Sequence, residues 1–171
     1  MVEIDPKVTE LAKKFFNLDK IIKDYDLENS GRLNLVNDDG RIYLKNNKIK
    51  YDAILNDAFS GETPARTLCT IEAIELIKSS LNDGGLYLTN ILGGYGKYSG
   101  FLYAEVNTLK KIFKNVYVIP CGELTNERPI NNMVIASDSD YDFDFSIDLK
   151  IPADTPILTD DYSPVEMLSD F

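Results

Sequence analysis

The chain has 171 residues, a formal net charge of −10 and no histidine. This length suits one domain with a single core, and 44% apolar with 27% charged residues is an ordinary globular balance. The negative charge argues against nucleic acid as a partner, because such binding depends on neutralising phosphates. With no histidine and no CxxC pair, the composition predicts no metal site.

Nothing in the sequence indicates export or membrane insertion. The first residues form neither a basic nor an apolar segment of the signal-peptide kind, and no apolar run approaches the ~20 residues of a membrane span. The two cysteines, Cys69 and Cys121, are isolated in the sequence and indicate reduced thiols. We therefore expect a cytoplasmic protein without a membrane partner.

The first fifty residues predict two strands, each followed by a helix. A short strand, 2–4, ends at Asp5, a capping residue followed by proline at the first helical position. Apolar residues then recur at helical spacing. A second strand, 32–36, ends in a turn-rich stretch, and a short helix around Ile42 and Leu44 follows it.

The rest of the chain predicts a strand-helix alternation that ends in a hairpin and a tail, 151–171. Strands are expected at 51–55, 86–92, 116–119 and 133–136, with helices between the first three. Apart from Asp52, the first of these is apolar, which is typical of burial on both faces. The segment between the last two has no helical period and favours an antiparallel hairpin. The alternation predicts an α/β fold with a largely parallel sheet and helices on both faces.

Acidic residues follow three of the predicted strands. In open parallel sheets, ligands bind beyond the carboxyl ends of the strands. Glu3 ends the first strand, Asp39 follows the second and Asp57 follows the third. A carboxylate in the position of Glu3 can accept two hydrogen bonds from ribose hydroxyls, and the alternative is a solvated carboxylate near a helix start.

Several motifs resemble, in order and spacing, those of spermidine and spermine synthases. They are VEIDPKV over residues 2–8, DDG over 38–40, YDAILNDAFSG over 51–61 and LNDGGL over 81–86. Together with TDDYSPVE over 159–166, they resemble a divergent bacterial branch of that family. The resemblance covers roughly residues 2–136 and the tail motif. It implies a three-layer, Rossmann-like fold of the methyltransferase type with a mostly parallel sheet.

Members of that family transfer an aminopropyl group from decarboxylated S-adenosylmethionine to an amine such as putrescine, and methylthioadenosine leaves. By motif match, Asp57 would be the general base that deprotonates the amine. Glu3 would hold the ribose, and Asp39 would contact the adenine amino group, with Gly40 beside it. The alternatives for Asp57 are a retained pocket residue or a plain loop or cap residue.

The acceptor site implied by the resemblance is less complete. Established enzymes of the family carry a second aspartate three residues after the base, where this chain has Ser60. Glu62 lies nearby and is a candidate substitute. Asp160, Asp161 and Tyr162 are candidates for a lid that offers carboxylates to a cationic amine, and the alternative is a surface tail.

The family's first strand and glycine-rich loop would precede the strand that ends at Glu3, and here Met1 stands directly before that strand. We therefore expect a single truncated domain, 1–171, with its first strand missing and its activity impaired. An aminopropyltransferase core is one hypothesis. The others are a methyltransferase that uses S-adenosylmethionine and a non-catalytic binding or assembly domain. We expect a small polyamine substrate and a homo-oligomer.

Overall fold

The computed structural model describes residues 1–60, 63–125 and 127–169. The chain divides into two compact units, Met1–Asn47 and Lys48–Phe171, and each is described by itself. The prediction of a single domain stays a prediction. Within the described ranges, no helix is long and apolar enough to cross a membrane.

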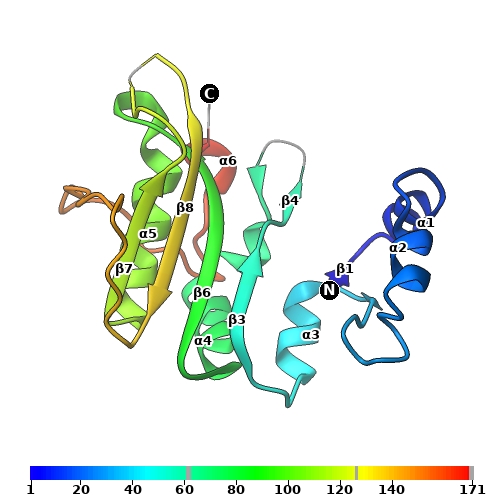
Figure 1. Ribbon diagram of the computed structural model, residues 1–171. Helices are drawn as coiled ribbons and strands as arrows, with labels where there is room; N and C mark the ends of the chain where they lie inside the picture. Colours follow the sequence, from blue (N-terminus) through cyan, green and yellow to red (C-terminus); the bar gives the residue numbers. More distant parts are fainter. Residues whose placement is uncertain (61–62, 126, 170–171) are drawn as a thin grey trace. The chain divides into compact units, whose positions relative to one another are not determined.

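The first unit contains two short parallel strands and three helices (Figure 1). Helix α1 begins where the sequence predicts, because the Asp5 side chain accepts a hydrogen bond from the Lys7 amide at 2.8 Å and proline occupies the first helical position. In chain order, the elements are β1 (Val2–Glu3), α1 (Pro6–Phe15), α2 (Leu18–Asp24), β2 (Val36–Asn37) and α3 (Gly40–Asn46).

Strand β2 lies later in the chain than the strand expected over 32–36. The amides of Arg32 and Leu33 both donate to the Leu27 carbonyl oxygen, at 2.9 and 3.0 Å. These two residues therefore belong to a turn after α2 and are not available for pairing. Only the end of the apolar segment reaches β1, where Val36 lies opposite Val2.

The second unit is built on a four-stranded sheet in the order β3-β6-β8-β7. Strands β3 and β6 are parallel, and β8 is antiparallel to both β6 and β7, so three of the four strands run in one direction. The predicted hairpin of the last two strands is confirmed. In chain order, the elements are β3 (Tyr51–Asn56), β4 (Phe59–Ser60), β5 (Thr63–Pro64), η1 (Arg66–Leu68), α4 (Ile71–Ser79), β6 (Leu81–Gly93), η2 (Gly96–Tyr98), α5 (Gly100–Ile112), β7 (Asn115–Pro120), β8 (Ile130–Ser137) and α6 (Val165–Leu168).

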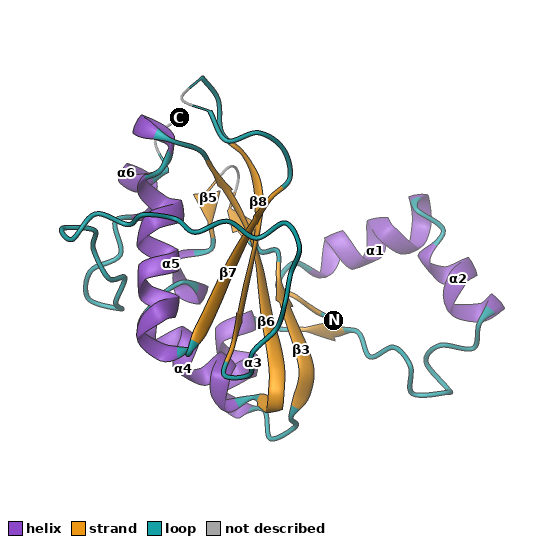
Figure 2. Cartoon of the chain, turned by 60° about the vertical axis from the view of Figure 1, so that its left-hand side comes forward, coloured by secondary structure: helices purple, strands orange, loops and turns teal. Residues whose placement is uncertain are grey.

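The core of this unit lies between the sheet and the two helices α4 and α5, which pack on one face of it (Figure 2). Every second residue of β6 is buried there, as the period of a strand requires. Tyr87 and Ile91 are the largest of these side chains. The other large side chains that are almost fully buried include Ile74, Ile77, Leu102, Val106, Leu109, Val118 and Val134.

Strand β3 is less buried than its apolar sequence predicts. Among the described strands it pairs only with β6, so it lies at an edge of the four-stranded sheet. The Leu55 side chain is 65% exposed, and Ala53 is also exposed. The expected burial on both faces is therefore wrong for this structure, because burial depends on neighbouring elements as well as on the strand itself.

A bulge interrupts the pairing of β3 with β6. Tyr51 lies opposite Leu81, whereas Ala53 lies opposite Leu86, so β6 has extra residues at this point. Gly84 lies within the bulge at φ +75°, a backbone conformation that glycine adopts without strain. Strand β6 therefore begins at Leu81, earlier than the strand expected over 86–92.

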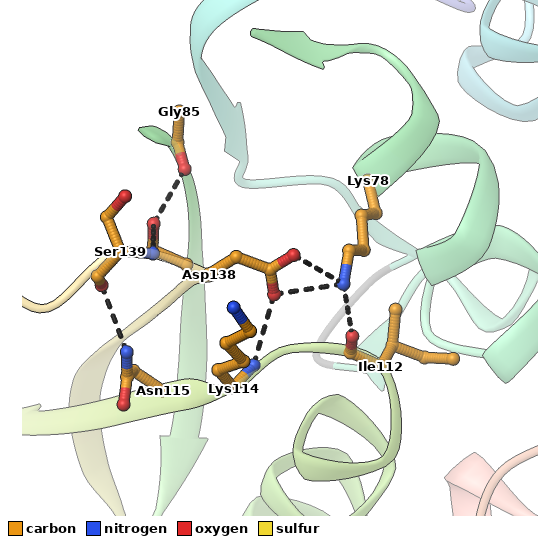
Figure 3. Close-up of polar contacts among 8 residues, drawn as sticks. Lys78, Gly85, Ile112, Lys114, Asn115, Asp138 and Ser139 are labelled. Atoms are coloured by element: carbon orange, nitrogen blue, oxygen red, sulfur yellow. Dashed lines mark hydrogen bonds and ion pairs between the residues drawn. The ribbon is translucent and has the colours of Figure 1, made fainter. Parts of the chain in front are cut away.

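Lys78, near the end of α4, joins three segments at the amino ends of β6 and β7 (Figure 3). Its Nζ donates to the Ile112 carbonyl oxygen at 2.6 Å and lies 2.7 Å from Oδ2 of Asp138, just after β8. The Lys114 amide donates to the Asp138 carboxylate at 3.2 Å. These contacts, with the hydrogen bond from Lys78 first among them, lower the pKa of Asp138 from its ordinary value.

We expect Asp138→Asn to lower the free energy of unfolding at neutral pH by roughly 0.5–1 kcal/mol, because both side chains of the pair are more than one third exposed. The folded-state pKa of Asp138 is depressed. Its stabilisation is therefore present above the unfolded-state pKa of about 3.9 and is lost as pH falls through the folded-state value.

Urea unfolding between about pH 7 and pH 3 measures this effect. The difference between wild type and Asp138→Asn should shrink towards low pH. Asp142→Asn removes the same charge from an exposed position in the following segment, and it is the control that should change little. A stability difference that does not vary with pH would show that the charge of Asp138 contributes nothing.

Candidate functional site

In the first unit, the acidic residues Glu3 and Asp39 lie at the same edge of a strand pair. Strands β1 and β2 are parallel, and Glu3 lies opposite Asn37, two residues before Asp39. Parallel strands have their carboxyl ends on the same side, where nucleotides bind in open α/β sheets. The strand pairing therefore brings together the two positions that the sequence suggests for ribose and adenine.

Backbone amides already orient both of these carboxylates. Oε1 of Glu3 accepts a hydrogen bond from the Asp5 amide at 2.9 Å. Oδ1 of Asp39 accepts from the amides of Arg41 and Ile42 at 2.8 and 3.0 Å, so Asp39 is the N-cap of α3, which begins at Gly40. This capping role was missed from the sequence, although an aspartate directly before a predicted helix is its usual signal.

In the second unit, Asp57 directly follows β3 at the carboxyl end of that strand and is exposed. Its Oδ1 accepts a hydrogen bond from Nδ2 of Asn90, on the neighbouring strand β6, at 3.0 Å. An amide donor on one carboxylate oxygen fixes the orientation of the group and leaves the other oxygen available to a substrate. Neither Asn90 nor this contact was anticipated from the sequence.

The tail residue Asp160 is bound at the start of α4. Its Oδ1 accepts from the Thr70 hydroxyl at 2.6 Å, and its amide donates to Oε2 of Glu72 at 2.9 Å. Because α4 connects two parallel strands, it begins at the carboxyl edge of the sheet. Asp161 is exposed and Tyr162 is 59% exposed. Their lid role stays a prediction, and Glu62 lies outside the described residues.

A carboxyl group, that of Glu105, is buried in the core of the second unit. Glu105 of α5 is 1% exposed, and its Oε2 has no hydrogen-bond partner among the residues that the structure describes. Burial raises the pKa of this carboxyl well above its ordinary value. Burial, and then the proximity of Glu105, raise the pKa of Cys69 to about 12 and also raise that of Tyr87. Cys69 and Tyr87 are therefore protonated at neutral pH.

The carboxylates that the sequence suggests for ligand binding divide between the two units. Glu3, Asp39 and Gly40 belong to the first unit, and Asp57 belongs to the second. In the part of the chain covered by the description, no group of three or more His, Cys, Asp or Glu side chains could hold a metal ion. The edge that carries Asp57 can offer carboxylate acceptors and amide donors to a cationic, hydrogen-bonding ligand.

Comparison with known proteins connects the chain to one family. Residues 1–122 match the family model described as the spermine/spermidine synthase domain. A polyamine aminopropyltransferase of Pyrococcus abyssi is 30% identical over 118 residues, which cover 68% of this chain and 42% of that protein. Polyamine aminopropyltransferase 2 of Hyperthermus butylicus is 36% identical over 116 residues, which cover 66% of this chain and 36% of that protein. The chain thus spans less than half the length of these relatives.

Solved structures agree in fold. A probable spermidine synthase from Corynebacterium glutamicum has a TM-score of 0.68 at 22% identity, covering 82% of this chain and 47% of that one. A spermidine synthase in complex with the transition-state analogue AdoDATO has a TM-score of 0.65 at 17% identity, covering 98% and 56%. Human methyltransferase-like protein 13 in complex with SAH has a TM-score of 0.57 at 20% identity, covering 80% and 59%. The expected Rossmann-like fold of the methyltransferase type is confirmed.

The buried carboxyl predicts a pH dependence of stability. The folded-state pKa of Glu105 is raised, so its contribution is fully present below the unfolded-state pKa of about 4.3 and is lost as pH rises towards the folded-state value. In that window the free energy of unfolding falls by up to about 1.4 kcal/mol per pH unit because of this group. We expect Glu105→Gln to remove this slope.

Urea unfolding at several pH values between about 5 and 8 measures the slope for wild type and variant. Glu75→Gln, on the exposed side of α4, is the matched control and should leave the slope unchanged. Equal slopes for wild type and Glu105→Gln would mean that the Glu105 carboxyl is ionised in the folded protein.

Proposed function

The chain belongs to the spermine/spermidine synthase domain family, and from that premise we propose that it forms the core of an aminopropyl transfer reaction. The proposed donor is decarboxylated S-adenosylmethionine, and the proposed acceptor is a polyamine such as putrescine. In this reaction the amine nitrogen attacks the propyl carbon next to the sulfonium sulfur. That carbon–sulfur bond breaks, and methylthioadenosine leaves with its electron pair.

The exposed carboxylate of Asp57 is the observation that carries this proposal. An alkylamine is protonated at neutral pH and must lose a proton before its nitrogen can attack, so a positioned base accelerates the reaction. Asp57 follows a parallel strand at its carboxyl end, and Asn90 holds one of its oxygens at 3.0 Å. We assign to Asp57 the acceptance of the amine proton through its other oxygen.

The first unit, taken by itself, supports the binding of a nucleoside. Glu3 and Asp39 follow two paired parallel strands, and backbone amides orient both carboxylates. In the proposal Glu3 binds the ribose hydroxyls, while Asp39, with Gly40, contacts the adenine. One similar spermidine synthase was solved with AdoDATO, which is consistent with an adenosyl donor for the proposed reaction.

We expect Asp57→Asn to reduce turnover of decarboxylated S-adenosylmethionine and putrescine by ~10²–10⁴-fold, the usual cost of losing a general base. The asparagine oxygen can still accept from Asn90, so the variant changes the basicity with little change in shape. Asp52→Asn is the matched control. Asp52 also accepts a hydrogen bond from an asparagine of β6, Asn82, at 2.8 Å, but it lies at the amino end of β3, whereas Asp57 follows the carboxyl end.

Product analysis in the same assay separates the competing functions. Methylthioadenosine and spermidine would support aminopropyl transfer, whereas S-adenosylhomocysteine formed from S-adenosylmethionine would indicate methyl transfer. Turnover that is equal in wild type and Asp57→Asn would remove Asp57 from the mechanism. The absence of turnover with both donors would favour a non-catalytic role.

Glu3→Ala should weaken the binding of methylthioadenosine by at least about tenfold, because charge-assisted hydrogen bonds to ribose contribute roughly 1.5–3 kcal/mol each. Glu3→Gln keeps one acceptor and should fall between wild type and Glu3→Ala. Isothermal calorimetry on the chain measures the three affinities. Glu10→Ala removes an exposed carboxylate from α1 and is the control. Equal affinities for wild type and Glu3→Ala would exclude Glu3 from the site.

A further inference from the structure

A buried hydroxyl lies behind the loop that carries Asp57. Tyr87 comes from the middle of β6 and is fully buried, and its ring stacks near Phe113 with centroids 6.4 Å apart and 11° between the planes. Close packing of this kind holds the ring, and therefore its hydroxyl, in one position. The hydroxyl oxygen accepts a hydrogen bond from Nδ2 of Asn56 at 3.0 Å.

Asn56 links this hydroxyl to the backbone on the far side of Asp57. Its Oδ1 accepts a hydrogen bond from the Ala58 amide at 3.3 Å, so the side chain spans the residue between them. A turn of this type restricts the backbone that it closes. The position of Asp57 therefore depends on the orientation of one carboxamide.

The two ends of that carboxamide are not equivalent. Nδ2 can only donate and Oδ1 can only accept, so a half-turn of the group would place Nδ2 against the Ala58 amide, with two donors facing each other. The Ala58 amide therefore sets the orientation of the carboxamide, and the Tyr87 hydroxyl, which can donate as well as accept, holds Nδ2 in that orientation by accepting from it.

We propose that Tyr87 is a positioning residue for Asp57. Its hydroxyl restrains the Asn56 side chain, Asn56 holds the backbone after Asp57, and Asn90 holds the carboxylate itself, so backbone and side chain are restrained from two strands. The inference rests on the proposed function of Asp57 as the base. Tyr87 touches no reacting atom in this proposal, and its influence on turnover passes through Asp57 alone.

Amide hydrogen exchange on the chain tests the link without requiring activity. Tyr87→Phe keeps the ring and removes only the hydroxyl, and it should speed exchange at the Ala58 amide by roughly two- to tenfold, as expected for one weakened hydrogen bond. Tyr117→Phe is the matched control. Tyr117 lies on β7, and its hydroxyl also accepts a hydrogen bond, from the Tyr141 amide at 2.9 Å. This control should leave Ala58 unchanged.

The variant Asn56→Ala separates positioning from a general loosening of the fold. It removes the Ala58 acceptor directly, so Tyr87→Phe should add nothing at Ala58 in that background. The inference would be overturned by unchanged exchange at Ala58, by acceleration spread over all of β6, or by a further increase in the Asn56→Ala background.

Turnover then tests the consequence for chemistry. Tyr87→Phe should lower kcat by about tenfold, with KM nearly unchanged, because a misplaced catalytic group can cost up to ~10²-fold. The same change in an Asp57→Asn background should have no further effect. A loss of kcat that persists without Asp57 would show a merely structural role for Tyr87. If Asp57→Asn leaves turnover intact, the proposed function fails, while the exchange at Ala58 still decides the link.

Discussion

The candidate site of the second unit depends on one constraint, the parallel pairing of β3 with β6. Two parallel strands cannot be joined by a tight turn, so the chain returns along α4 and brings both carboxyl ends to the same edge. Asp57 and Asn90 meet at this edge although 33 residues separate them. The same crossover starts α4 there, where Thr70 binds the tail through Asp160.

Much of the fold follows from local patterns in the sequence. The Asp5 cap with the proline after it defines the start of α1, and the lack of a helical period between the last two apolar runs predicts the β7–β8 hairpin. The exposure of β3 and the late start of β2 depend on information that a local pattern lacks. The first depends on which strands pair with β3, and the second on the amides of Arg32 and Leu33, which bond within a turn.

Only the carboxylates of the candidate site could be predicted from the sequence. Glu3, Asp39 and Asp57 can be identified because each is an acidic residue at the end of a predicted strand, where ligands bind in open parallel sheets. This inference does not require knowing which strands are neighbours. The amides and hydroxyls that hold Asp57 lie inside strands, where their partners come from another strand and are set by register. Glu105 could have been found from the sequence, since it lies three residues after Leu102 on the apolar face of α5.

The bulge in β6 limits which changes of length the chain tolerates. Two carboxamide–carboxylate pairs connect β6 to β3, Asn82 with Asp52 and Asn90 with Asp57. The partners are 30 residues apart in the first pair and 33 in the second, and the bulge accounts for this difference. A change of length that the bulge does not absorb, at the end of the strand far from Asp57, would oblige the strands to keep one pair and lose the other. A slip of one residue would also reverse the face that each side chain occupies. Homologues should therefore vary in length less at this bulge than in loops that are not flanked by paired side chains.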